Sequence, residues 1–223
     1  MENKRKIAFF DFCETLVNFQ TADAFVDYVR EQTQSKRMHR LEDIRNFCIH
    51  YKVFSIIGRI TRYKYPIFKI SKLYQLKGFK RDELEYHAQK YYHEVIKQNF
   101  ITELIDILKQ KKNDGYEIVL VSGGYDIYLK YFAAEFGVDN IISSRIKFKR
   151  DKCLGILWGL DCLSYNKVIL LNSQYHPGEI VSEAYSDSVS DKPFLSWANI
   201  GYVVSKNKSQ NWVNNSNYKE IIW

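Results

Sequence analysis

The sequence predicts an α/β fold with a helical insertion, and three observations support this prediction. Short β-branched runs alternate with helical segments from residue 116 onward, which is typical of a parallel sheet with helices on both faces. An apolar run, Ile7–Asp11, supplies a further strand near the start. Between these parts only helical patterns occur. We therefore expect a Rossmann-like three-layer core at 1–16 and 99–223, and an all-helical cap at 17–98.

The first half of the chain holds one strand and then several helices. The apolar run Ile7–Asp11 is short and continuous, as in a buried strand. Thr21 or Asp23 is available to cap the helix that follows. Further helices are expected in pieces over 39–75 with a break near Pro66, then at 81–100 and at 101–115. Gly115 is suited to end the last of these in the left-handed conformation.

The second half alternates between strands and helices. A β-branched run at 116–124 ends in two glycines and precedes a helix at 125–137. The next two runs, 140–150 and 155–160, are expected to form a pair of strands. A helix at 166–175, a strand at 179–187, a short helix at 188–198 and a strand at 200–205 follow. The polar tail is expected to be irregular until its last few residues.

The composition indicates a folded chain of 223 residues with 46% hydrophobic and 16% aromatic content. Such a chain can bury a sizeable core. Its four cysteines form no C-x-x-C pair, so we expect free thiols in a reducing compartment. The basic start is followed by only four apolar residues before Asp11, and no run approaches the roughly 18 apolar residues of a spanning helix. The sequence therefore favours a soluble, cytoplasmic protein.

The positive charge of the chain is concentrated in the predicted cap. The net charge is +7, but residues 36–81 carry 13 Lys and Arg against two acids, about +11. The rest of the chain is mildly acidic. This basic, Tyr-rich stretch is either a solvated face or a surface that attracts an anionic substrate or membrane, with Arg59, Arg62 and Lys64 as candidates. A nucleic-acid partner is not expected, because no recognition motif is present, and nothing indicates an oligomeric state.

Polar residues follow the expected strands at equivalent places. They are Asp11, Ser122 with Gly123 and Gly124, Lys167 at the start of a helix, and Asp187 with Asp191. In an open α/β sheet, ligands bind in the crevice outside the carboxyl ends of the strands. We therefore expect these groups to share one pocket. Lys149 and Lys152 are rivals for the place of Lys167, and Asp191 has an alternative role as a helix cap.

The chemistry of this set suits a phosphate ester. A carboxylate such as Asp11 can attack phosphorus and form an acyl phosphate. Lys167 offers a positive charge to the phosphate, and Ser122 with the Gly123 and Gly124 amides can donate hydrogen bonds to its oxygens. Mg²⁺ prefers carboxylate and phosphate oxygens. Asp187 could bind Mg²⁺ alongside Asp11, while Asp191 could steady either the metal waters or the lysine.

The segments DFCETL, VSGG and YSDSVSDKPFL, with a lysine before a helix between the last two, resemble the four motifs of the haloacid dehalogenase (HAD) superfamily. The phosphoserine-phosphatase-like branch, whose helical cap follows the first motif, is the most similar. The resemblance implies a magnesium-dependent phosphohydrolase or phosphotransferase acting on a small phosphorylated metabolite. It implies Asp11 as nucleophile, Ser122 and Lys167 as phosphate ligands, and Asp187 with the Cys13 carbonyl as metal ligands, supported by Asp191.

The chain departs from the family pattern D-x-D-x-T at Cys13. The second Asp of the pattern protonates the leaving oxygen and then activates water. A thiol is a weak acid with a reference pKa of about 8.5. Three interpretations follow: a substrate with a good leaving group, a proton supplied by Glu14 or a cap residue, or loss of hydrolysis. In the last case the chain is a phosphate-binding or phosphotransfer protein. Its basic cap would then associate with an anionic partner or a membrane surface.

Overall fold

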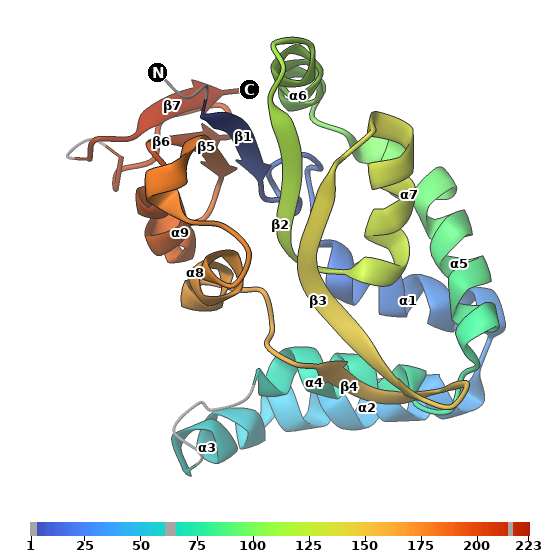
Figure 1. The fold of residues 1–223 in the computed structure, drawn as a ribbon. Coiled ribbons are helices and arrows are strands. Elements are labelled where there is room, and N and C mark those ends of the chain that lie inside the picture. The colour runs from blue at the N-terminus through green and yellow to red at the C-terminus, as the bar shows by residue number, and fades with distance from the viewer. Residues whose placement is uncertain (1–3, 61–65, 214–215) are drawn as a thin grey trace.

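One mostly parallel sheet forms the centre of the molecule (Figure 1). A computed structural model describes residues 4–60, 66–213 and 216–223, with the side chains of 57–60 left undescribed. In this part of the chain seven strands lie in the order β4-β3-β2-β1-β5-β6-β7. They are β1 (Arg5–Phe10), β2 (Glu117–Tyr125), β3 (Asn140–Lys149), β4 (Lys152–Trp158), β5 (Ile180–Ser186), β6 (Ile200–Ser205) and β7 (Lys219–Ile222). Only β3 and β4 pair antiparallel among them, which confirms the predicted fold class.

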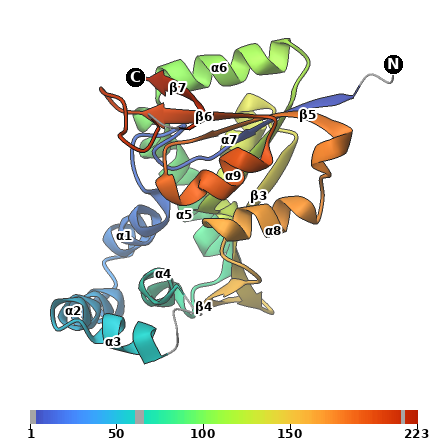
Figure 2. The same cartoon turned by 90° about the vertical axis from the view of Figure 1, so that its left-hand side faces the viewer.

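Helices cover both faces of this sheet, as predicted. Successive residues of a strand point to opposite faces, so Ala8 and Phe10 of β1 join one hydrophobic cluster while Ile7 and Phe9 join another. Helices α6 (Thr102–Asn113) and α7 (Asp126–Phe136) contribute to the first cluster. Helices α8 (Tyr165–Asn172) and α9 (Lys192–Trp197) contribute to the second (Figure 2).

The segment between β1 and α6 forms helices, as predicted. They are α1 (Thr21–Thr33), α2 (Lys36–His50), α3 (Val53–Ile60), α4 (Ile67–Leu73) and α5 (Arg81–Glu94). Figure 1 places α2, α3 and α4 at the lower end of the molecule, where β4 also lies. Phe25 of α1 and Tyr91 of α5, however, belong to the same cluster as the sheet. The division into core and cap therefore stays a prediction.

Two helix ends test the capping arguments. Helix α6 ends as predicted, because Gly115 has φ +78° and the Tyr116 and Gly115 amides bond back to the carbonyls of Lys111 and Lys112. The expected single helix at 81–100 is wrong. Helix α5 ends at Glu94 and a 3₁₀ turn, Ile96–Asn99, follows. The Asn99 side chain donates to the Val95 carbonyl at 2.8 Å, which favours the turn over a continued helix.

The antiparallel pair β3–β4 extends from the sheet into the helical insertion. Its two strands confirm the predicted pair. Backbone hydrogen bonds join Cys153 of β4 to Gly78 and Phe79, and the Arg81 amide donates to the Asp151 carbonyl at the turn. Gly155 is required there, since a Cβ would lie 2.8 Å from the Tyr74 Cα. The hairpin is thus a backbone connection between the sheet and the insertion.

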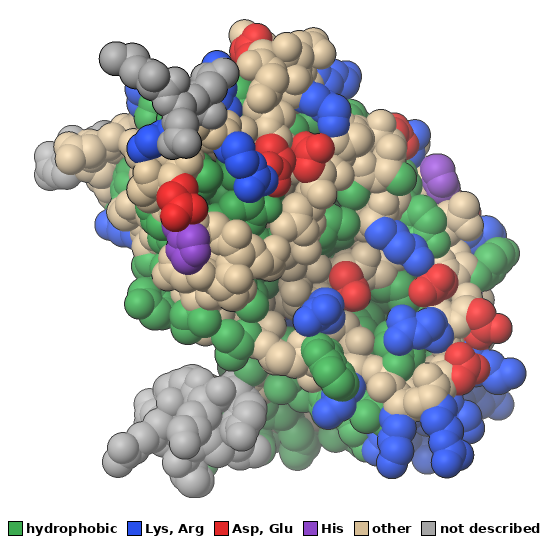
Figure 3. Space-filling view, viewed as in Figure 1, with side chains coloured by type: hydrophobic (Ala, Val, Ile, Leu, Met, Phe, Trp, Pro, Cys, Tyr) green, Lys and Arg blue, Asp and Glu red, His purple; other side chains and the backbone are tan. Residues whose placement is uncertain are grey.

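Lys and Arg side chains gather at the lower right of the molecule in Figure 3, over the region of α2 and the β3–β4 turn in Figure 1. The candidates Arg59, Arg62 and Lys64 lie outside the residues whose side chains are described, so contact with an anionic surface stays a prediction. No helix in the described parts of the chain has both the length and the hydropathy needed to cross a bilayer. All four cysteines are free, as predicted.

Candidate active site

Asp11 is the first residue after β1, at the carboxyl edge of the sheet. Strands β2 and β5 flank β1, so Asp11 lies in the middle of that edge. Phe9 and Phe10 anchor the end of the strand in the two hydrophobic clusters. The Asp11 amide donates to the Tyr185 carbonyl at 2.9 Å, and its Oδ1 accepts the Phe12 amide at 2.6 Å. The backbone therefore fixes the direction of this carboxylate.

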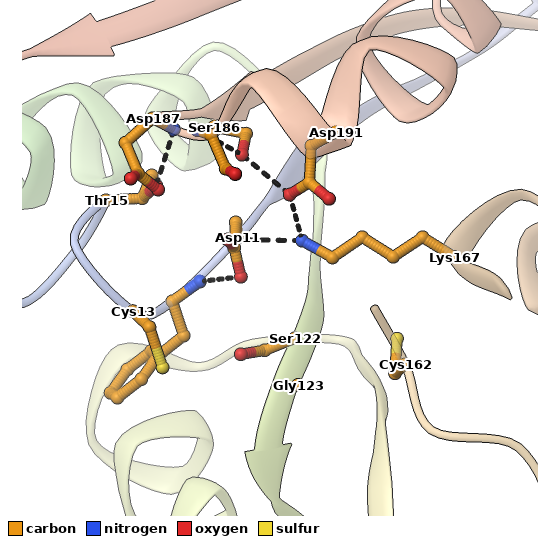
Figure 4. Close-up of polar contacts among 12 residues, drawn as sticks. Asp11, Cys13, Thr15, Ser122, Gly123, Cys162, Lys167, Ser186, Asp187 and Asp191 are labelled. Carbon is orange, nitrogen blue, oxygen red and sulfur yellow. Dashed lines mark hydrogen bonds and ion pairs between the residues drawn. The ribbon is translucent and has the colours of Figure 1, made fainter. Parts of the chain in front are cut away.

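Lys167 joins Asp11 to Asp191 (Figure 4). Its Nζ lies 3.1 Å from Asp11 Oδ2 and 2.5 Å from Asp191 Oδ2, and the side chain is 1% exposed. Ser186 Oγ also donates to Asp191 Oδ2, at 2.7 Å. Burial lowers the pKa of Lys167, but the charges of Asp11 and Asp191 outweigh this and hold the pKa above its ordinary value. The ammonium therefore stays charged beside Asp11.

The rival lysines and the rival role for Asp191 are settled by position. Lys149 and Lys152 lie at the β3–β4 turn and not at Asp11. The backbone of Lys152 forms an isolated antiparallel β-bridge with that of Lys80. Asp191 occupies the N-cap position of α9 but makes no side-chain cap hydrogen bond. Asp191 contacts the lysine, as one of its two expected supporting roles requires, and its role toward metal waters stays a prediction.

Asp187 follows β5 and lies on the other side of this group. Thr15 Oγ1 donates to Asp187 Oδ1 at 3.2 Å and accepts the Asp187 amide at 3.1 Å. Burial, and then the charges of Asp11 and Glu14, raise the pKa of Asp187 to about 7. Burial likewise raises the pKa of Asp11 to about 6, against the opposing effect of Lys167. The buried carboxyl of Asp11 thus acts on the half-buried carboxyl of Asp187 at this edge, an arrangement that suits a bound cation.

The predicted phosphate loop is a bulge at the end of β2. The β2–β3 register shifts between Ser122 and Tyr125, so Gly123 and Gly124 are extra residues in the ladder. Ser122 Oγ accepts the Gly124 amide at 3.1 Å, which leaves the hydroxyl proton free to donate. A Cβ at Gly123 would lie 2.4 Å from the Leu163 side chain, and one at Gly124 would lie 2.9 Å from Tyr128 OH. Close packing therefore requires both glycines.

Cys13 is buried and hydrogen-bonded, two residues after Asp11. Its Sγ lies 3.1 Å from Thr21 Oγ1, which in turn lies 2.7 Å from Tyr128 OH. Thr21 is thus engaged with Cys13, and not with the start of α1, whose N-cap is Gln20 without a cap hydrogen bond. Burial and the charge of Asp11 raise the pKa of the thiol. Cys13 is therefore a neutral group at physiological pH, neither a nucleophilic thiolate nor a base.

A pocket of about 390 Å³ lies beside Asp11, although Ser122, Gly124 and Lys167 are buried or absent from its lining. It is lined by Asp11, Cys13, Gly123, Asp187 and Asp191, together with residues of α1 and α4. A separate cavity of about 440 Å³ lies among α2, α3 and α4, and its lining is chiefly apolar. None of the predicted site residues appears in that lining. The pocket at Asp11 is therefore the candidate active site.

A model of haloacid dehalogenase-like hydrolases matches residues 8–196, which hold every predicted site residue. The chain belongs to this family. Over 163 residues it is 29% identical to a phosphoserine phosphatase of Methanocaldococcus jannaschii, a match that covers 71% of the chain and 64% of that protein. The family prediction is confirmed.

Solved structures resemble this hydrolase in fold. A Bordetella pertussis protein of unknown function superposes with a TM-score of 0.76 at 18% identity, over 98% of this chain and 99% of that one. A phosphoserine phosphatase in apo form gives 0.57 at 22% identity, over 90% of this chain and 86% of that one. At these identities the likeness establishes the fold alone.

Sequence reasoning missed a second charged cluster of the hydrolase. Lys69 of α4 reaches the core, where its Nζ lies 2.5 Å from Asp161 Oδ1, 3.1 Å from Ser144 Oγ and 2.5 Å from the Gly123 carbonyl. Nothing in the basic run around Lys69 distinguishes this lysine. The place of Thr15 in the site could have been predicted, because Thr15 is the last residue of the D-x-D-x-T pattern.

Lys69→Met is expected to destabilise the fold, because it leaves Asp161 buried without its cation. Breaking a buried pair from one side costs about 3–5 kcal/mol. Lys97→Met is the matched control, since Lys97 pairs with Glu135 at 2.8 Å with both side chains about one third exposed, and such pairs contribute about 1 kcal/mol or less. Urea denaturation measures both free energies of unfolding. Equal losses in the two variants would contradict the prediction.

Proposed function

We propose that this hydrolase is a magnesium-dependent phosphatase of small phosphate monoesters, with Asp11 as the nucleophile. The observation that carries the proposal is the contact of Asp11 Oδ2, whose residue lines the pocket, with the buried ammonium of Lys167, 3.1 Å away. A carboxylate held there faces any anion that the lysine attracts. The similarity to a phosphoserine phosphatase supports the same chemistry.

The chain's own residues account for binding and attack. Lys167 would neutralise the phosphoryl group, while the Ser122 hydroxyl and the bulge at Gly123 donate to its oxygens. Asp11 then attacks phosphorus, so that an aspartyl phosphate forms and the alkoxide leaves with the bonding electron pair and takes a proton from water. Asp191 positions the lysine through its 2.5 Å contact. Water would release phosphate in a second step.

Asp11 and Asp187, with the main-chain carbonyl of Cys13, are the groups that would hold Mg²⁺. They offer only oxygen ligands, which Mg²⁺ prefers, and burial together with the charge of Asp11 raises the pKa of Asp187 when no cation is bound. No cluster of three His, Cys, Asp or Glu side chains suited to a metal occurs in the described part of the chain, so this set relies on a backbone ligand. A bound Mg²⁺ would neutralise the phosphate oxygens.

The proposal is tested with p-nitrophenyl phosphate and acetyl phosphate, whose leaving groups need little protonation. We expect phosphate release that requires Mg²⁺ and stops when EDTA is added. Restoring Mg²⁺ in excess should restore release, which separates loss of the cation from damage by the chelator. Release that is equal with and without the metal would overturn the metal requirement.

A second candidate function follows from Cys13, whose neutral thiol occupies the place of the family's acid. In this case the chain binds phosphate esters without turning them over. Binding of inorganic phosphate or vanadate, measured by calorimetry, together with no release from either reagent, would favour this function over the phosphatase.

A further inference from the structure

Part of the pocket is lined by residues that the proposed attack on phosphorus does not use. We call this part the alcohol subsite, and it is lined by Glu14, Gln20, Asp23, Phe68, Lys69 and Leu163. These residues come from the loop after β1, from α1 and α4 of the helical insertion, and from the loop before α8. Their charges and hydrogen bonds can be compared with those of candidate substrates.

Lys69 does not offer its charge to a substrate. An ammonium has three N–H donors, and Lys69 Nζ has three acceptors: the Gly123 carbonyl, Ser144 Oγ and Asp161 Oδ1, at 2.5 to 3.1 Å. The side chain is 11% exposed. Lys69 is the one Lys or Arg among the described residues lining this pocket. Among the residues whose side chains are described, a substrate anion in the alcohol subsite would therefore find no uncommitted lysine or arginine.

Two carboxylates line the same subsite. Asp23 is 49% exposed, and its cationic neighbour Arg45 lies 3.5 Å away and is shared with Glu42. Glu14 is exposed and accepts a hydrogen bond from Gln20 Nε2 at 2.6 Å. A substrate carboxylate or second phosphate would meet these charges and be repelled. Hydroxyl groups, by contrast, would donate to the carboxylates in strong, charge-assisted hydrogen bonds.

Apolar surface completes the subsite. Phe68 is 46% exposed and Leu163 is 44% exposed, although both line the pocket. Such surface suits the C–H groups of a carbon chain or a sugar ring. Carboxylate acceptors beside apolar faces therefore match a molecule with many hydroxyls and no negative charge apart from its phosphate.

We propose that this pocket selects phosphate esters of uncharged polyols or sugars and rejects alcohols that carry a carboxylate or a second phosphate. The inference rests on the proposed phosphatase function and names the substrate class of the same site. It separates this chain from an enzyme for phosphoserine, whose alcohol carries a carboxylate.

The test uses pairs of esters that differ only at one carbon. Sorbitol 6-phosphate and 6-phosphogluconate differ by CH₂OH against carboxylate, as do glycerol 3-phosphate and 3-phosphoglycerate. We expect the neutral member of each pair to have a kcat/KM at least about tenfold higher, since one unshielded charge pair at contact is worth more than that factor. Equal or higher values for the acids would overturn the proposal.

Two variants of α1 test the cause of the selection. Asp23→Asn is expected to reduce the preference within each pair several-fold, because it removes a negative charge from the subsite. Glu31→Gln is the matched control, since Glu31 is exposed on the same helix and does not line the pocket. Should Asp23→Asn prove unstable, Glu14→Gln makes the same change from the loop. A preference unchanged in both pocket variants would overturn the electrostatic cause.

Binding separates failure of this inference from failure of the phosphatase proposal. Calorimetry on Asp11→Asn with Mg²⁺ measures the Kd of each ester without turnover. Tighter binding of the neutral members supports the inference even where p-nitrophenyl phosphate is not hydrolysed. Tighter binding of the acids, or binding of inorganic phosphate but of neither ester, counts against it even where hydrolysis occurs.

Discussion

Asp11→Asn is expected to abolish phosphate release, with a fall in kcat of at least about 10³-fold. The amide cannot attack phosphorus, and it removes the charge that faces Lys167 at 3.1 Å. Release of p-nitrophenol with Mg²⁺ measures the loss. Circular dichroism and a thermal melt check that the variant is folded.

Trapping the aspartyl phosphate tests directly whether Asp11 is the nucleophile. The wild-type protein, quenched in acid during turnover of radiolabelled acetyl phosphate, should carry label that hydroxylamine removes, as an acyl phosphate does. Asp11→Asn should carry none. Label of equal amount in the variant would place the nucleophile elsewhere and contradict the assignment of Asp11.

Cys13→Asp is expected to raise turnover of alkyl phosphates by about 10²-fold or more, the usual contribution of general acid–base catalysis. The thiol is neutral and held by Thr21 at 3.1 Å, so it protonates a departing alkoxide poorly. Acetyl phosphate, whose leaving group is already a weak base, should gain far less. The measurement is the ratio of kcat for glycerol 3-phosphate to kcat for acetyl phosphate.

Cys13→Ser is the matched control for this gain, because it keeps the size and hydrogen bonding of the thiol without adding an acid. We expect it to leave the ratio within about threefold of the wild-type value, as serine cannot act as a general acid. Should the Asp variant remain folded and gain nothing on either substrate, another group already supplies the proton, and Glu14 would be the next residue to replace.

The strand-end residues of the site could be predicted because topology alone brings them together. Asp11 and Asp187 follow strands that lie side by side in the sheet, and their carboxyl ends share one edge. Lys167 could be predicted from its place near the start of a helix, α8. No knowledge of side-chain packing was required for these positions, and the family motifs pointed to the same residues.

The contacts between the insertion and the core could not be predicted in the same way. Lys69 and Asp161 are 92 residues apart, and their pairing depends on how α4 lies over the sheet. Thr21 was one of two residues, with Asp23, available to cap α1, a local role, but its hydroxyl instead contacts Cys13 and Tyr128. In both cases tertiary packing decides between partners that local sequence leaves equivalent.

The β3–β4 hairpin limits how access to the pocket can change. Besides the two chain crossings on either side of the insertion, its hydrogen bonds at Gly78, Phe79 and Arg81 form a third tether. A body attached at two points can swing about the line that joins them, but a third attachment off that line removes the swing. Substrate entry would then proceed by bending within α2, α3 and α4 or by flexing of the hairpin itself, and not by rotation of the insertion as one rigid lid.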